Sequence, residues 1–413
     1  MRELEIKLHG PPDALASLSR ALRAHGAKRS RLQATPIAAL SERHATHVTR
    51  LRCHVHDALG SDIEVTLDIG TPSVAASPAP IAELGLRHHG GPLQGLFDLA
   101  AAWIRHGGLW ICTVHGPDRG ERVRKQQAHS PAVKAPSPRL DHDADGPTLM
   151  RLFLRSALEQ VLAHAGGVAE GSSDAETIHQ VRVGLRRLRT VLREGAALSP
   201  AIAPSWDAVL ARAFAQLGQR RDEEVVAAAV RPLLEAASAP RLSWQARGSA
   251  DPALVVREAS FQTTLVAVLA LAHAGAERFA PLSPAAAREL LAKRLRNLHR
   301  KVVLPGRRFE RLPLAEQHRV RKRLKRLRYL AELAAGLYPR DAVHSDLRRL
   351  GAAQDALGRH NDVAVAAAAF RADAREHASA WFAAGYLQAH LAVTGRAARK
   401  ALTRIVDAKH FWD

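Results

Sequence analysis

The chain has 413 residues, with 60 Lys and Arg against 40 Asp and Glu, and so carries a formal net charge of +20. At about 100–200 residues per domain this length predicts two or three domains, and 47% hydrophobic residues is typical of a globular chain. Two cysteines exclude a disulfide framework, and no apolar run approaches the roughly 20 residues of a membrane span. The acidic, amphipathic start is unlike a signal peptide. We therefore expect a cytoplasmic protein, and the charge indicates an anionic partner.

The first part of the chain predicts an α+β domain over residues 1–125. Arg2–Leu8 alternates apolar and charged residues, which is typical of a half-buried strand. Further strands are predicted at His47–His56, Asp62–Ile69, Ile81–His88 and Leu109–His115, and helices at about Pro12–His25 and Leu93–His106. Residues 126–147 contain four prolines and lack apolar periodicity, so they predict an interdomain linker.

From residue 148 to the end the sequence predicts helices only, because Ala, Leu and Arg dominate. Breaks at Gly166-Gly167 and at several prolines divide this region into about eight to ten helices. Residues 151–413 hold 42 Lys and Arg against 25 Asp and Glu, which places +17 of the net charge in this region. The all-α domain over 148–413 is therefore the expected site of anion binding.

The helical region contains an internal repeat. His179–Arg189 (HQVRVGLRRLR) aligns with His318–Arg328 (HRVRKRLKRLR) at an offset of 139 residues. Downstream, Leu217–Asp222 aligns with Leu357–Asp362 at an offset of 140. Two motifs at one offset predict two halves, about 148–280 and 281–413, each a bundle of about four helices related by a pseudo-twofold axis.

Each repeated helix presents a stripe of cations. At about 100° per residue, the cations of the first copy fall within about 80° of one another and apart from the apolar side. The first stripe is His179, Arg182, Arg186, Arg189 and Arg193; the second is His318, Arg321, Lys325 and Arg328; Arg187 and Arg326 lie to the side. Like charges at this spacing disfavour a helix by a few tenths of a kcal/mol per pair. A stripe of roughly 15 Å suits several successive phosphates. A solvated face is the alternative, and the repetition favours an anion site.

Two further residue types in the repeat are informative. Ser173–Glu176 is a capping-box pattern, which predicts His179 in the second turn of a helix, where it could donate to phosphate or pack against a neighbouring helix. Its cationic neighbours disfavour metal ligation, and we expect neither metal nor cofactor. Asp222 and Asp362 are predicted to cap or begin helices, with a salt bridge to a stripe arginine as the alternative.

The two segments that begin at His179 and His318, each followed by Leu-Gly and an Asp, resemble the CHAD family, the conserved histidine α-helical domain, over about residues 148–413. The resemblance implies two four-helix bundles and a basic surface or channel that binds inorganic polyphosphate without catalysis. The resemblance implies a set of binding residues in the two repeated helices, with Arg155 and Arg294 at a matching offset on the preceding helices. The implied residues are His179, Arg182, Arg186, Arg189, His318, Arg321, Lys325 and Arg328, and we add Arg193, Arg187 and Arg326 of the same helices as candidates. Lys325 replaces an arginine of the first copy, so the halves are expected to bind differently.

Glu3-Leu-Glu-Ile-Lys7 resembles the signature of CYTH triphosphate-tunnel domains, which often precede CHAD domains. Asp62–Gly70 and the Leu96–Ala100 segment are also similar to that family. However, the chain has Gly85 where a second acid is expected, and about five strands rather than eight. Metal-dependent hydrolysis needs clustered carboxylates. We therefore predict a degenerate CYTH-like domain, with a partial antiparallel tunnel or sheet and no catalytic residues.

The combined prediction is a protein that binds inorganic polyphosphate without catalysis, docks on cytoplasmic polyphosphate granules and has no membrane partner. Nucleic-acid backbone binding is the second choice, because aromatic residues are 4% and only Tyr329 lies near a stripe, whereas single-strand binders need stacking platforms. A weak metal-dependent triphosphatase in the N-terminal domain is the third. The sequence does not indicate an oligomeric state.

Overall fold

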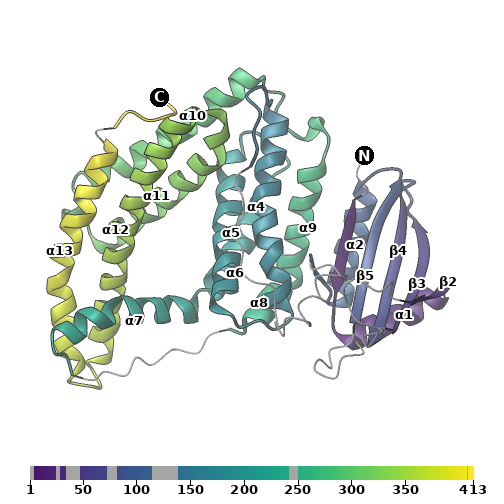
Figure 1. Ribbon diagram of the computed structural model, residues 1–413, viewed down its shortest axis with the longest axis horizontal. Coiled ribbons are helices and arrows are strands. Elements are labelled where there is room, and N and C mark those ends of the chain that lie inside the picture. The colour runs from purple at the N-terminus through teal and green to yellow at the C-terminus, as the bar shows by residue number, and fades with distance from the viewer. Residues whose placement is uncertain are drawn as a thin grey trace.

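The computed structural model describes residues 4–24, 28–33, 47–71, 81–113, 138–240, 250–406 and 408–413. A sheet with two helices lies at one end of the molecule, helices α4–α6, α8 and α9 lie in the middle, and α10–α13 lie at the other end (Figure 1). The predicted α+β region and the helical region that follows it are thus both confirmed. Most of the predicted linker, residues 126–137, lies outside the described residues, and α4 begins at Gly146.

The N-terminal region is an antiparallel sheet with strand order β2-β3-β4-β5-β1-β6. Its strands are β1 (Glu5–His9), β2 (Lys28–Gln33), β3 (His47–His56), β4 (Asp62–Thr71), β5 (Ile81–Gly90) and β6 (Trp110–Ile111). Five of these match predicted strands, and β2 was not predicted. Within the described residues the sheet is open, with β2 and β6 at its edges, so the CYTH-like character of this domain stays a prediction.

Helices α1 (Pro12–Ala24) and α2 (Gln94–Gly107) complete the core of this region. The predicted alternation in the first strand is confirmed, because Ile6 and Leu8 are buried with Leu84 and Leu86 of the paired strand. The same alternation places charged residues of these strands on the opposite face of the sheet.

The helices of the C-terminal region correspond in two halves. The first half contains α4 (Gly146–Ala169), α5 (Ala175–Gly195), α6 (Pro204–Gln216), α7 (Gln219–Ala236), α8 (Pro252–Arg257) and α9 (Ala259–His273). The second contains α10 (Pro284–Gly306), α11 (Leu314–Ala334), α12 (Arg340–Asp373) and α13 (Ala380–Val406). These are ten α-helices within the described ranges, in the predicted number. The predicted break at Gly166-Gly167 is wrong, because α4 continues through both glycines.

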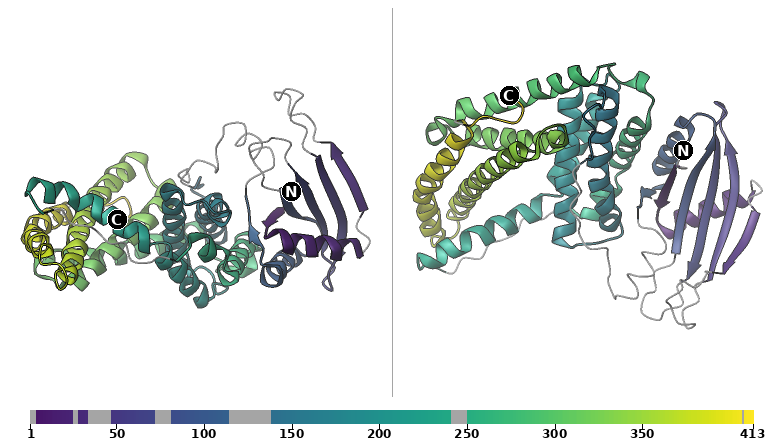
Figure 2. Two further views of the ribbon diagram at one scale, coloured as in Figure 1. Left: turned by 90° about the horizontal axis from the view of Figure 1, so that it is seen from below. Right: turned by 45° about the horizontal axis from the view of Figure 1, so that its top comes forward.

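Helix α7 leaves the first half and crosses to the second (Figures 1 and 2). Val226, Val230 and Leu234, spaced one helical turn apart, pack with apolar residues of α12 and α13. The single helix α12 spans the sequence that corresponds to α6 and α7 together. Of the prediction of two four-helix bundles, only a C-terminal region of many helices is therefore confirmed.

The sheet packs directly on the first half of the helical region. Ile111 N donates to Gln262 Oε1 at 2.9 Å, and the Arg257 guanidinium lies 4.4 Å from the centre of the Trp110 ring. One cluster of buried apolar side chains runs from the sheet through α4 and α5 to α10 and α11. No helix in the described part of the chain has the length and apolar character needed to cross a membrane.

Candidate anion-binding surface

Helix α5, which carries the first stripe, is held at its start by Asp174. The Asp174 carboxylate accepts from Thr177 N at 2.7 Å and from Thr177 Oγ1 at 2.7 Å. The predicted cap at Ser173 is thus off by one residue, while the predicted place of His179 in the second turn is confirmed. Val181, Leu185 and Leu188 are fully buried, as the sequence predicts. Arg182 of the predicted cationic stripe is also buried, with 3% of its surface exposed, so the two sides of the helix do not divide fully.

Helix α11 carries the second stripe and lies against α5, so the two stripes meet. Lys325 shows this most directly: burial, followed by the nearby charges of Arg186 and Arg321, lowers its pKa to about 7, and Arg182 acts in the same direction. Two of these three arginines come from the first stripe. We refer to Arg182, Arg186, Arg321 and Lys325 as the cationic junction. The junction thus contains cations of both halves.

An aromatic ring supports the first-half arginines of the junction. The guanidinium carbons of Arg182 and Arg186 each lie 4.8 Å from the centre of the Phe214 ring on α6. An aromatic ring in contact with two guanidinium groups attracts and orients both of them. Sequence reasoning missed Phe214, and its place three residues before the repeated Leu217-Gly218 pair is the signal that could have found it.

Asp362 is the acid that acts on Lys325, and its charge raises the lysine pKa against the effect of three cations. It lies in the middle of α12 rather than at the start of a helix. The capping interpretation of Asp362 is therefore wrong, because α12 runs unbroken past the second Leu-Gly pair. The alternative, an acid paired with the cationic stripe, fits its position. A cavity of about 360 Å³ lies beside Lys325, lined also by Gln354, Asp355, Gly358, Arg359 and Asp362.

The far ends of both stripes are paired with acids. Arg189 Nε and an Arg193 nitrogen donate to Asp207 of α6 at 2.9 and 2.6 Å. Burial opposes the charge of Asp207, but the hydrogen bonds from these arginines lower its pKa overall. Arg326 lies 3.6 Å from Glu194 of α5, and Arg328 donates to Glu332 at 2.8 Å. The outer cations of both stripes are thus held by acids of α5, α6 and α11.

The second stripe begins at His318, which lies beside α12. Its Nδ1 is 2.9 Å from Asn361 Oδ1, which fits a neutral ring that donates through Nδ1. Burial lowers the pKa of His318, and neighbouring cations including Lys322 lower it further. His318 and Arg321 also line an apolar cavity of about 260 Å³ between α11 and α12. His179, at the matching place in α5, is half-buried.

Three other predicted residues lie outside the junction. Arg187 is buried and donates to Gln160 and Ser156 of α4, at 2.9 and 3.4 Å. Arg155 donates to the carbonyl of Ala272 at the end of α9, on another side of α4. Arg294 is half-buried on α10. The structure therefore brings together the inner residues of the two stripes and leaves these three arginines in other surroundings.

The charged face of the sheet contains acids that bond cations. Arg50 donates to Asp68 through two bonds of 2.6 Å, and Glu64 bonds Arg52 at 2.8 Å. Lys7 donates to Glu83 of the paired strand. Glu5 lies 3.8 Å from Arg87. Each of these carboxylates thus has a cationic partner on the same face.

Comparison with known proteins places the helical region in a family. The CHAD domain model matches residues 152–371, which is more than half of the chain. The crystal structure of the CHAD domain from the plant Ricinus communis is similar at 29% identity and a TM-score of 0.52, covering 67% of this chain and 97% of that one. PptA from Streptomyces chartreusis is 21% identical with a TM-score of 0.47, covering 64% of this chain and 100% of that one. No curated protein matches the chain. The family-model match over the repeated cationic helices shows that the chain belongs to the CHAD family.

Proposed function

We propose that the protein binds inorganic polyphosphate at the cationic junction without chemical turnover, and that this binding docks it on polyphosphate granules. The observation that carries the proposal is the contact between α5 and α11, which brings cations of both stripes together. Burial and then the charges of Arg186 and Arg321 lower the pKa of Lys325, as expected for a lysine placed among cations. A polyphosphate chain supplies closely spaced negative charges along a line, which matches two cationic helices that meet.

The surroundings of the junction favour an anion that is recognised through its phosphates. Arginine forks bind phosphate oxygens in pairs. The Phe214 ring is already contacted by Arg182 and Arg186, so its stacking capacity serves the arginines rather than a nucleobase. The half-buried position of His318 allows a phosphate to supply the charge that would raise its pKa and protonate the ring.

A competition measurement separates polyphosphate from nucleic acid. Labelled long-chain polyphosphate is bound to the full chain and challenged with duplex DNA, duplex RNA or unlabelled polyphosphate at equal phosphate concentration. We expect only polyphosphate to compete efficiently, with an affinity that falls steeply as salt rises. Equal displacement by either duplex would overturn the proposal in favour of nucleic-acid backbone binding.

We also propose that the N-terminal domain does not hydrolyse triphosphate. Glu83 and Asp68 bond Lys7 and Arg50, and among the described residues the carboxylates of the sheet face do not form a group of three metal donors. Phosphate release from tripolyphosphate with Mg²⁺ or Mn²⁺ tests this. Turnover that disappears in Glu3→Gln and Glu5→Gln variants would show instead that the domain is an active triphosphatase.

A further inference from the structure

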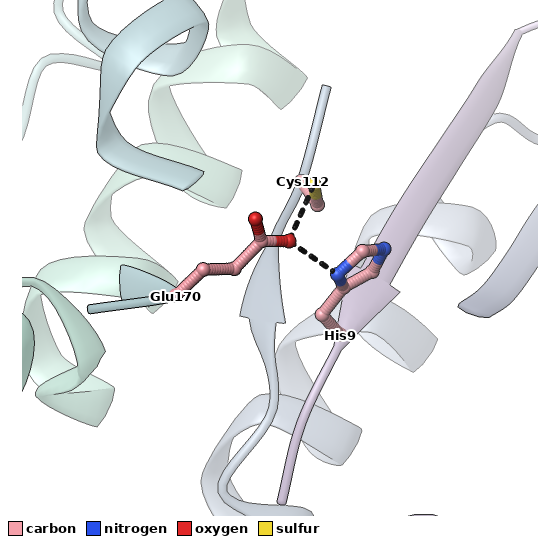
Figure 3. Close-up of side chains that lie close together, drawn as sticks. All are labelled: His9, Cys112 and Glu170. Carbon is pink, nitrogen blue, oxygen red and sulfur yellow. Dashed lines mark hydrogen bonds and ion pairs between the residues drawn. The ribbon is translucent and has the colours of Figure 1, made fainter. Parts of the chain in front are cut away.

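Three donor side chains from distant parts of the sequence meet where the sheet joins the helical region (Figure 3). His9 ends β1, Cys112 directly follows β6, and Glu170 follows the last residue of α4. One donor atom from each lies within 4.8 Å of the others. His9 Nδ1 is 3.0 Å from Glu170 Oε1, and Cys112 Sγ is 3.8 Å from the same oxygen.

The backbone fixes each of these side chains independently. His9 pairs with Trp110 across the β1–β6 ladder, and Cys112 N donates to Lys7 O at 2.9 Å. Glu170 N donates to Gly166 O at 2.9 Å, which holds it at the C-terminal end of α4. The three donors therefore lie at the end of one strand, directly after another and at a helix end, where the backbone holds them in place as a metal site requires.

The donor set has the chemistry of a zinc site. Thiolate, imidazole and carboxylate are the three side-chain ligands of Zn²⁺, whereas Mg²⁺ and Ca²⁺ prefer oxygen alone. The cluster also has a typical outer partner: His9 Nε2, the ring nitrogen on the other side, lies 3.7 Å from Glu83 Oε2. A carboxylate behind a histidine fixes the orientation of the ring toward a metal. Glu83 is held in turn by Lys7.

We propose that His9, Cys112 and Glu170 bind one Zn²⁺ ion that links the sheet to the helical region. His9 and Cys112 are buried, while the Glu170 side chain is 23% exposed, so a water molecule can reach the fourth position. Three protein ligands and a water complete a tetrahedral shell. This site is independent of the proposed polyphosphate surface. It also departs from the expectation of no metal, which rested on the cationic stripes.

The thiolate provides a readout that surface histidines do not. His54, His56 and His89 lie near Asp62 and Glu64 on the sheet, and such exposed groups bind zinc weakly without sulfur. Co²⁺ replaces Zn²⁺ in tetrahedral sites and gives a sulfur-to-cobalt charge-transfer absorption only when a thiolate is bound. The absorption therefore distinguishes the proposed site from adventitious histidine binding.

The experiment titrates Co²⁺ and then Zn²⁺ into the full metal-free chain. We expect about one Co²⁺ per chain with charge-transfer absorption, displaced by about one Zn²⁺. Cys112→Ser should lose the absorption and weaken zinc binding by at least about tenfold, while Cys53→Ser, which removes the other thiol, should change neither. His9→Gln and Glu170→Gln should weaken zinc binding by about 10- to 100-fold.

Absence of the charge-transfer absorption in the unmodified chain would overturn the proposal without any variant. So would a band that persists in Cys112→Ser and is lost in Cys53→Ser. Circular dichroism checks the helix content of each variant. If Cys112→Ser fails to fold, the spectrum of the unmodified and Cys53→Ser chains decides. Zinc should also raise the Tm of the unmodified chain and leave that of folded Cys112→Ser unchanged.

Discussion

The two halves of the helical region share a cationic helix of 21 residues but differ in the helix that follows it. In the first half the chain breaks between α6 and α7 at Leu217-Gly218, whereas α12 runs unbroken for 34 residues through Leu357-Gly358. The same dipeptide therefore does not dictate a break. After the break in the first half, the apolar side of α7 packs against α12 and α13 of the second half.

The halves also differ in how their cations are compensated. In the first half the Phe214 ring contacts Arg182 and Arg186, and Asp207 pairs with Arg189 and Arg193 at the far end of the stripe. In the second half the charged form of Lys325 is disfavoured by burial and by arginines of both stripes, and His318 bonds Asn361. The repeat thus preserves the cationic positions while their surroundings diverge, which supports unequal contributions of the two halves to binding.

The largest expected effect comes from reversing charge in both halves at once. The Arg182→Glu, Arg321→Glu double variant should weaken polyphosphate binding at least about 100-fold, because each lost charged contact contributes roughly 1.5–3 kcal/mol. The control is Arg20→Glu, Arg105→Glu, which makes the same change in net charge on exposed arginines of α1 and α2. Fluorescence titration measures binding, and circular dichroism checks folding. Equal losses in the two double variants would mean that net charge alone governs binding.

The pH dependence should distinguish Lys325 from its counterpart Arg186. Because the pKa of Lys325 is about 7, the lysine loses its proton as pH rises, and an anion must restore that proton to gain its charge. Affinity for long polyphosphate should therefore fall by up to about tenfold per pH unit above pH 7. Lys325→Arg should remove this dependence between pH 7 and 9. A parallel decline in the variant would show that another group titrates.

Substituting the equivalent glycines should give opposite changes in stability. Gly358 lies inside α12, and an added Cβ meets nothing within 4 Å, so Gly358→Ala should raise the free energy of unfolding by about 0.5–1 kcal/mol. Gly218 is the N-cap of α7, where Ala is unfavourable, so Gly218→Ala should lower it by about 0.5 kcal/mol. Urea unfolding measures both changes. If alanine stabilises the protein at both positions, Gly218 does not favour the break between α6 and α7.

The smallest expected effect tests the paired end of the first stripe. Asp207→Asn removes the acid that holds Arg189 and Arg193 and should tighten polyphosphate binding by about 2- to 5-fold, in line with the weak energies of exposed ion pairs. Glu332→Gln, which removes the partner of Arg328, is the matched variant in the second half. Weaker binding in Asp207→Asn would show that the acid positions these arginines for the anion.

Much of this architecture could be predicted because its signals are periodic. The strands at residues 47–56 and 62–71 and the buried side of α5 follow apolar spacing in the sequence. Strand β2 has no such spacing: it reads Lys-Arg-Ser-Arg-Leu-Gln and pairs on one side only, as a polar edge strand does. The repeat offset identified the stripes, but their meeting depends on how α5 packs against α11, and no local pattern encodes that contact.

The crossing of α7 has a consequence for how the chain folds. Its apolar residues belong to the first half in sequence but complete a core made by α12 and α13. A fragment that ends before α12 would expose those side chains, and a fragment that begins at α10 would lack them. We therefore expect the two repeat halves to unfold together, because each depends on apolar contacts made through α7.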